Sequence, residues 1–185
     1  EDELNVRSEV GLNFSLQKMN RFTTLSNYRD PAVRSSIHLV KYHNHPKAKR
    51  LLSDLLREYL ISINGKSTII PIPLSKKRLN KRGYNQVTEV IKLATAKSPN
   101  VHLMEKILVR SIDTIPQTTL NRAKRLTNVV GAFDIVNPEK AGEYIFGKHI
   151  ILVDDVATTG ATLSAAKATL LPHSPASVTC VAFSH

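Results

Sequence analysis

One segment, Ile150 to Thr162, constrains the fold of this chain more than any other, and it reads IILVDDVATTGAT. Its opening aliphatic run predicts a buried strand, because such runs bounded by turn residues are typical of parallel sheets. The glycine- and hydroxyl-rich residues that follow predict a turn that opens a helix. Backbone N–H groups and the helix dipole favour an anion at such a helix start. The segment therefore predicts an α/β fold with a phosphate site at the carboxyl end of a strand.

Two acids, Asp154 and Asp155, stand between the predicted strand and turn. Carboxylates beside an anion-binding turn fit a ligand that carries hydroxyls or a divalent cation as well as a phosphate. A sugar phosphate with Mg²⁺ has the phosphate, the hydroxyls and the cation. The alternative is an ordinary strand–turn–helix with a capped N-terminus. Capping explains one threonine, but not two adjacent acids followed by small and hydroxyl residues.

The charge balance indicates anionic partners. The formal net charge of +11 and the sequence pI near 9.9 predict affinity for polyanions and anionic substrates. The positive charge therefore makes DNA a candidate partner. Aromatic residues make up only 5% of the chain and form no interleaved stacking platform for single strands. The competing explanation of the net charge is a basic, solvated surface with no specific partner.

Cysteine content and hydropathy exclude several classes of protein. The single cysteine, Cys180, excludes an internal disulfide and a multi-cysteine zinc site, and its apolar neighbours predict an inert core residue. No apolar run approaches the roughly 18 residues that a membrane helix needs. The acidic, polar N-terminus is unlike a signal peptide. We therefore expect a cytoplasmic protein with no membrane contact.

Hydrophobic periodicity predicts strands that alternate with helices, which favours a mostly parallel sheet with flanking helices. Helices are expected near residues 47–63, 86–96 and 163–171, and strands near 67–74, 107–109, 132–136, 149–153 and 177–183. Residues 1–30 show no firm period and are expected to be a partly ordered extension. The expected organisation is an N-terminal extension and hood helix over 1–65 and a core domain over 66–185.

A second segment, residues 69–86, reads IIPIPLSKKRLNKRGYNQ. Five of the seven residues from Lys76 to Arg82 are basic, and they follow a predicted strand, so they are expected at the same sheet edge as the acids. Pro71 and Pro73 stiffen the connection. A rigid loop beside basic side chains can hold a pyrophosphate. Taken alone, the segment is better explained as a solvated charge run.

Several motifs occur in one order: IPIPL, RGYNQ, RxxxTxxQxxL, RxxNxxGAF and VDDVATTGAT. In this order they resemble the ComF family, a branch of the type I phosphoribosyltransferases linked to DNA uptake and competence. The resemblance implies that the ligand is phosphoribosyl pyrophosphate (PRPP), with Asp154 and Asp155 as the catalytic pair that holds the ribose hydroxyls. It places the 5′-phosphate on Ala157, Thr158, Thr159, Gly160, Ala161 and Thr162.

The resemblance also implies a pyrophosphate loop at Ile72, Pro73, Leu74 and Ser75, to which we add the basic Lys76, Arg78 and Arg82. A mobile loop that closes over PRPP is expected in the 114–128 region, with Gln117, Arg122 and Arg125 as ligand contacts. A polar surface helix explains that region equally well. Typical ComF proteins carry an N-terminal four-cysteine zinc finger, and this chain has only one cysteine.

The expected activity is transfer of a phosphoribosyl group from PRPP to a nucleobase or amine, with release of pyrophosphate. Mg²⁺ is expected as cofactor, held through PRPP and by Asp154 and Asp155, with no separate protein metal site. One alternative is a catalytically weak competence protein that senses PRPP or a nucleotide and binds DNA through its basic surface. Another is a subunit of a DNA-uptake machine, held to competence proteins by its N-terminal helices.

Overall fold

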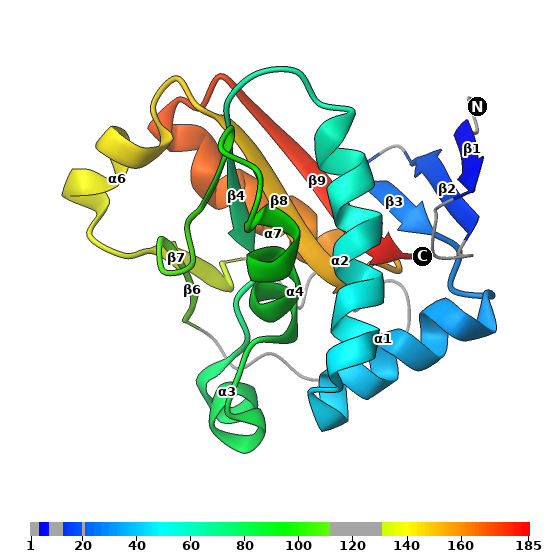
Figure 1. The fold of residues 1–185 in the computed structure, drawn as a ribbon. Coiled ribbons are helices and arrows are strands. Elements are labelled where there is room, and N and C mark those ends of the chain that lie inside the picture. The colour runs from blue at the N-terminus through cyan, green and yellow to red at the C-terminus, as the bar shows by residue number, and fades with distance from the viewer. Residues whose placement is uncertain (1–3, 8–12, 20, 112–130) are drawn as a thin grey trace.

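The computed structural model describes residues 4–7, 13–19, 21–111 and 131–185. Its centre is a seven-stranded sheet in the order β1-β2-β3-β9-β8-β4-β5 (Figure 1). The strands are β1 (Leu4–Arg7), β2 (Asn13–Lys18), β3 (Thr23–Ser26), β4 (Ser67–Pro71), β5 (Val101–Leu103), β8 (His149–Val156) and β9 (Ser177–Ser184). All strands from β3 to β5 in this order pair in parallel, whereas β1, β2 and β3 pair antiparallel. The sheet is therefore mostly parallel, as the sequence predicts.

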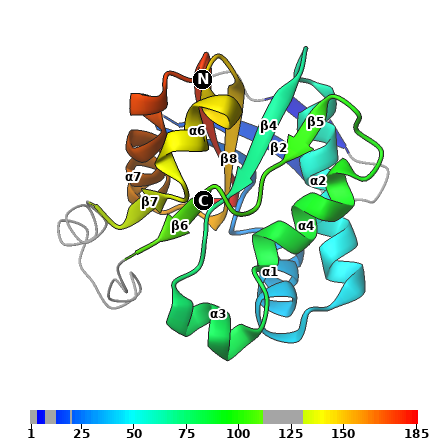
Figure 2. The ribbon, with the colours of Figure 1, turned by 90° about the vertical axis from the view of Figure 1, so that its left-hand side faces the viewer.

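Helices cover both faces of the sheet (Figure 2). One face carries α1 (Pro31–His43), α2 (Pro46–Ile61) and α4 (Gln86–Thr95). The other carries α7 (Ala161–Leu170), α6 (Pro138–Ile145) and a two-stranded ribbon of β6 (Leu108–Arg110) and β7 (Phe133–Ile135). The short helices α3 (Lys76–Arg82) and η2 (Leu171–His173) follow β4 and α7.

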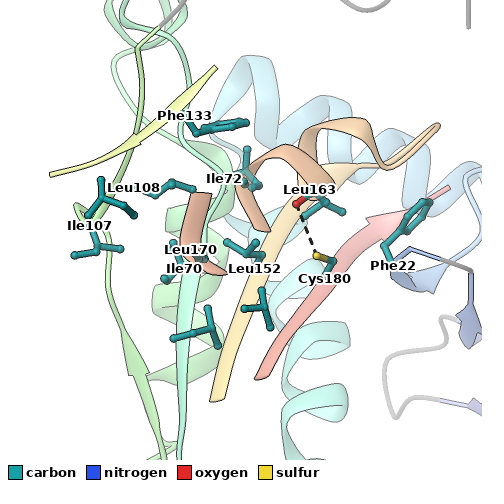
Figure 3. Packing of buried hydrophobic residues seen from close by; sticks show 14 of the residues in the cluster. Phe22, Ile70, Ile72, Ile107, Leu108, Phe133, Leu152, Leu163, Leu170 and Cys180 are labelled. Carbon is teal, nitrogen blue, oxygen red and sulfur yellow. Dashed lines mark hydrogen bonds between the residues drawn. The ribbon is translucent and has the colours of Figure 1, made fainter. Parts of the chain in front are cut away.

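Strand alternation divides the core into two clusters. Along β8, Ile151 and Val153 pack with α1, α2 and α4, whereas Ile150 and Leu152 pack with α7. Figure 3 shows the α7 side, where the Cys180 thiol lies 3.8 Å from the Leu163 carbonyl oxygen. Burial raises the pKa of Cys180 to about 11. This confirms the prediction that Cys180 is an inert core residue.

Capping residues and prolines account for the starts of α1, α2 and α4. Asp30 caps α1, because its Oδ1 accepts from the Ala32 N–H at 2.8 Å. Pro31 and Pro46 occupy the first turns of α1 and α2, where no intrahelical donor is needed. Asn85 caps α4 by accepting from the Val87 N–H at 3.0 Å. These caps fix where each helix begins relative to the strand ends.

Two sequence expectations are corrected. Residues 13–26 are more than an extension, because β3 pairs in parallel with β9 and Leu25 is fully buried. Residues 76–82 form helix α3 rather than a loop, with Ser75 as its N-cap. The division at residue 65 stays a prediction, although side chains from both sides of it share one core cluster. Across the described ranges, every helix is too short or too polar to cross a bilayer.

Candidate functional site

The turn between β8 and α7 depends on Gly160. This residue has a φ of +70°, which glycine adopts without the steric cost that other residues carry. A Cβ at this position would lie 2.6 Å from Cδ1 of Phe22, so the ring of Phe22 also excludes any side chain here. Phe22 packs edge-on to His185 with ring centroids 5.7 Å apart. The turn is therefore tightly backed by segments from both ends of the chain.

Of the six predicted phosphate residues, 157–160 form this turn, and Ala161 and Thr162 begin α7. Ala157 and Ala161 are 4% and 5% exposed, and their methyl groups belong to the core. The Ala157 N–H donates to the Ser184 carbonyl at 3.0 Å, and the Ala161 N–H donates to Thr159 Oγ1 at 3.3 Å. The alanines thus shape the backbone of the turn, while Thr158 is exposed.

Asp155 is held by two neighbouring helices. Its Oδ2 accepts from Gln86 Nε2 at 2.7 Å and lies 3.2 Å from Lys41 Nζ, and its Oδ1 accepts from the Val156 N–H at 2.8 Å. Burial alone would raise the pKa of Asp155, but the Lys41 charge and the Gln86 hydrogen bond outweigh it and lower the pKa. Asp155 is therefore ionised at neutral pH and ties α1 and α4 to the end of β8.

Asp154 has a different environment. Strand alternation places it in register with Ile150 and Leu152, on the α7 side of the sheet. Burial, followed by the neighbouring Asp155 charge, raises the pKa of Asp154 to about 7. The two adjacent acids are thus unequal: one is a compensated anion, and the other exchanges its proton near neutral pH. Such opposed shifts are common where a ligand binds.

The predicted pyrophosphate loop lies beside the acids. In the parallel pairing of β4 and β8, Pro71 stands opposite Val153, and the Ile72 N–H donates to the Val153 carbonyl at 2.8 Å. Asn85 Nδ2 donates to the Ile72 carbonyl at 2.9 Å, which anchors the loop to the start of α4. The loop therefore leaves β4 at the same edge at which β8 presents Asp154 and Asp155.

The RGYNQ motif connects these parts. Arg82 donates to Gln86 Oε1, and its guanidinium carbon lies 5.9 Å from the centroid of the Tyr42 ring. Because Gln86 and Lys41 both contact Asp155, and Tyr42 is next to Lys41, these contacts close a ring. We call the five residues of this set the polar ring: Lys41, Tyr42, Arg82, Gln86 and Asp155. It joins α1, α3, α4 and β8.

Tyr84, also in the RGYNQ motif, fastens the end of α1. Its hydroxyl donates to the Val40 carbonyl at 2.6 Å and accepts from the Asn44 N–H at 3.0 Å. Asn44 is the left-handed C-cap of α1, with φ of 49°. Tyr84 thereby holds the segment that carries Lys41 against the start of α4.

The other predicted site residues are placed as follows. Of the basic set, Arg82 connects to the acids through Gln86, whereas Lys76 is exposed and Arg78 half-buried on α3. Gln117, Arg122 and Arg125 lie outside the described residues.

Sequence reasoning missed Lys41, Gln86 and Phe22 as parts of this edge. A signal for Lys41 existed: it stands four residues after Ile37 and one after Val40, on the buried side of α1.

The donor set fits Mg²⁺ that arrives with a diphosphate. Mg²⁺ uses one or two protein carboxylates together with substrate phosphates, and the edge offers Asp154 and Asp155. Within the ranges that the structure describes, no group of three or more His, Cys, Asp or Glu side chains could hold an ion by itself. Asp154 is the better candidate, because Lys41 already compensates Asp155.

Comparisons with known proteins show the family to which the chain belongs. The family model "Phosphoribosyl transferase domain" matches residues 79–184. The "DNA utilization protein YhgH" of Escherichia coli strain K12 is 26% identical over 166 residues, which cover 85% of this chain and 69% of that protein. "Competence protein F" of Haemophilus influenzae is 29% identical over 153 residues, which cover 78% of this chain and 64% of that protein.

Solved structures with a similar fold are more distant. A hypoxanthine phosphoribosyltransferase of Staphylococcus aureus matches with a TM-score of 0.42 and 16% identity, over 72% of this chain and 61% of that one. The Trypanosoma cruzi hypoxanthine phosphoribosyl transferase matches with a TM-score of 0.42 and 12% identity, over 82% of this chain and 63% of that one. This chain therefore spans less than two thirds of either enzyme. Because the family model covers more than half of the chain, the chain belongs to the phosphoribosyl transferase domain family, as a member of the ComF type.

Proposed function

We propose that this protein binds PRPP with Mg²⁺ at the carboxyl edge of β4 and β8 and transfers its phosphoribosyl group to a nucleobase or amine. One observation supports this most. The acid pair at the end of β8 lies between the glycine-dependent turn that leads into α7 and the loop after β4, which is hydrogen-bonded to β8. Anion, diol and second anion sites then follow one another along a single edge. That is the order of groups in a sugar phosphate activated with pyrophosphate.

In the proposed reaction, the bond between C1′ and the pyrophosphate oxygen breaks with both electrons leaving on pyrophosphate. A lone pair on the acceptor nitrogen forms the new bond to C1′, and an N–H proton of the acceptor passes to water. Asp154 and Asp155 would hold the ribose hydroxyls, and the 157–162 turn the 5′-phosphate. Residues 72–75, with Lys76, Arg78 and Arg82, would hold the leaving group. Gln117, Arg122 and Arg125 are proposed to close over it.

Bound Mg²⁺ would supply neutralisation of the diphosphate charge. The protein's own contribution is then positioning and electrostatic stabilisation, with no covalent protein intermediate.

Calorimetric titration with PRPP and Mg²⁺ tests the proposal. We expect Asp155→Asn to weaken binding by at least about tenfold, because a charged hydrogen-bond acceptor is lost. Asp134→Asn, an exposed acid on β7, is the matched control and should bind as the wild type does. A wild-type protein that does not bind PRPP would refute the proposal. A pyrophosphate-release assay with a panel of bases and amines would then identify the acceptor.

A second candidate function is DNA binding, with the PRPP site serving as a sensor. The two relatives are named for DNA utilization and competence. The observation in its favour is Tyr42, which is 62% exposed on α1 and lies beside the His38 ring and the Arg82 guanidinium. An exposed ring beside a guanidinium is suited to stacking on an unpaired base.

A salt titration with single- and double-stranded DNA tests this candidate. Binding through phosphates should fall steeply with salt. Tyr42→Ala should reduce single-strand affinity by about tenfold, which corresponds to the loss of one stacked base. Tyr144→Ala, which removes a half-exposed ring on α6, should leave affinity unchanged. Equal effects of the two variants would argue against stacking on α1.

Proteins of the competence machinery are proposed as further partners, on the relatives' names alone. A test of such partners requires the whole chain. Deleting residues 1–65 would remove β3, α1 and α2, whose side chains form much of one core cluster.

A further inference from the structure

The Asp155 carboxylate has little acceptor capacity left for a ligand. A carboxylate has about four lone-pair sites. Three are engaged: Oδ1 by the Val156 N–H, and Oδ2 by Gln86 Nε2 and Lys41 Nζ. A ribose diol that donates to the acid pair needs acceptor sites on it. Both lone-pair sites of Oδ2 are taken, so a ribose hydroxyl that donates to this oxygen must displace one of its two present partners.

Lys41 is the partner that can leave. Gln86 is 5% exposed, begins α4, and is also engaged by Arg82 through its Oε1, so moving it would break a second contact. The Lys41 side chain is 32% exposed, and its four-carbon chain lets the ammonium swing into water. The loss of the ion pair is then compensated by hydration of the ammonium.

Resting on the proposed function, we infer that Lys41 is a resident cation of the ribose subsite, which a ribose hydroxyl displaces from Asp155. The reaction itself gives a second reason for this displacement. Positive charge develops on the sugar as pyrophosphate leaves, and an ammonium held beside the ribose would oppose that charge. Release of Lys41 therefore frees an acceptor and removes an unfavourable cation in the same movement. Lys41 thus sets how tightly the site accepts ribose.

Ribose 5-phosphate with Mg²⁺ is the appropriate probe, because it has the hydroxyls and the 5′-phosphate but no pyrophosphate for Lys41 to contact. By calorimetry, Lys41→Met should bind this probe about twofold to fivefold more tightly than the wild type, since no ion pair of the kind worth up to about 1 kcal/mol has to be broken. Lys41→Arg keeps a cation beside Asp155 and should not show the tighter binding. Equal or weaker binding by Lys41→Met would overturn the inference.

Lys92→Met is the matched control for lost positive charge. Lys92 Nζ lies 3.2 Å from Glu105 Oε1, the same distance as in the Lys41–Asp155 pair, but on the outer side of α4. This variant should show unchanged or slightly weaker binding. Tighter binding by both variants would assign the effect to net charge and would also overturn the inference.

Lysine labelling in the wild type supplies a readout that needs no variant. Acylation of Lys41, followed by peptide mass spectrometry, should increase when ribose 5-phosphate is added, whereas acylation of Lys92 should not change. Unchanged Lys41 labelling at saturating probe would contradict displacement. A wild type that binds neither PRPP nor ribose 5-phosphate would instead refute the proposed function, so the two failures are distinguishable.

Discussion

The β8–α7 turn and the polar ring lie at the same edge of the sheet but are built in opposite ways. The turn consists of consecutive residues, and its shape depends on Gly160 packed under the Phe22 ring. The ring consists of side chains from α1, α3, α4 and β8, joined by polar contacts that are partly open to water. Packing makes the turn rigid, whereas the ring can exchange a partner for a ligand. Under the proposed function, the edge combines a fixed anion site with an adjustable diol site.

The largest expected effect is on the turn. Gly160→Ala places a Cβ 2.6 Å from the Phe22 ring and forces a non-glycine residue to a φ of +70°. Strain of about 1–2 kcal/mol from the backbone adds to about 1–3 kcal/mol from overpacking. Thermal unfolding should shift down by roughly 5–15 °C.

Gly147→Ala separates the two causes of that loss. Gly147 has a similar φ of +65°, but nothing lies within 4 Å of the Cβ that the substitution would add. It should lose only the backbone part, so its melting temperature should fall less than that of Gly160→Ala. Equal losses in the two variants would mean that Phe22 does not make the turn rigid.

A smaller effect is expected where Tyr84 supports the ring. Tyr84→Phe removes the hydroxyl that donates to the Val40 carbonyl and accepts from the Asn44 N–H. The free energy of unfolding should fall by about 1 kcal/mol, as is usual for a lost hydrogen bond. Hydrogen exchange should become faster at the C-terminal end of α1 and stay unchanged in α7. Uniformly faster exchange would show that the ring and the turn are not independent. Tyr144→Phe on α6 is the control.

The last expected effect depends on pH and concerns the acid pair, where the two regions meet. Asp154 has a pKa of about 7 when folded, against 3.8 without its environment, so folding takes up protons between these values. Stability contributed by this group is therefore lost as pH rises from about 4 to 7. Asp154→Asn cannot ionise, so at pH 8 it should melt above the wild type.

At pH 4 Asp154→Asn and the wild type should melt nearly alike, because Asp154 is then protonated in the folded state and only about half ionised in the unfolded state. Calorimetry across this pH range checks the prediction. A gain at pH 4 equal to that at pH 8 would show that charge is not the cause. If the proposed function holds, the same variant should also bind PRPP more weakly, so that stability and binding change in opposite directions.

Sequence-based prediction succeeded where the hydrophobic pattern of a segment was strong. The strand ending at Asp154 and Asp155, the helix after it and the amphipathic helix α2 all have strong periodic patterns, and the structure confirms them. Strands β1 (LNVR) and β2 (NFSLQK) alternate apolar and polar residues, but they are too short for the pattern to stand out, and β3 (TTLS) shows no alternation. Helix α3 carries no apolar stripe, and only its cap at Ser75 marks its start. The β3 strand forms because its partner β9 is available in the folded sheet.

The sequence by itself determined the acid pair, the glycine-dependent turn and the order of motifs along one edge. These features depend on residues that are neighbours in the chain, so local conformation is sufficient to define them. Only the tertiary structure decided which side chains meet Asp155. Gln86 is 69 residues away from it in sequence, and Lys41 comes from a helix that precedes both. No local pattern encodes these contacts, because they form only when α1 and α4 pack on the same face of the sheet.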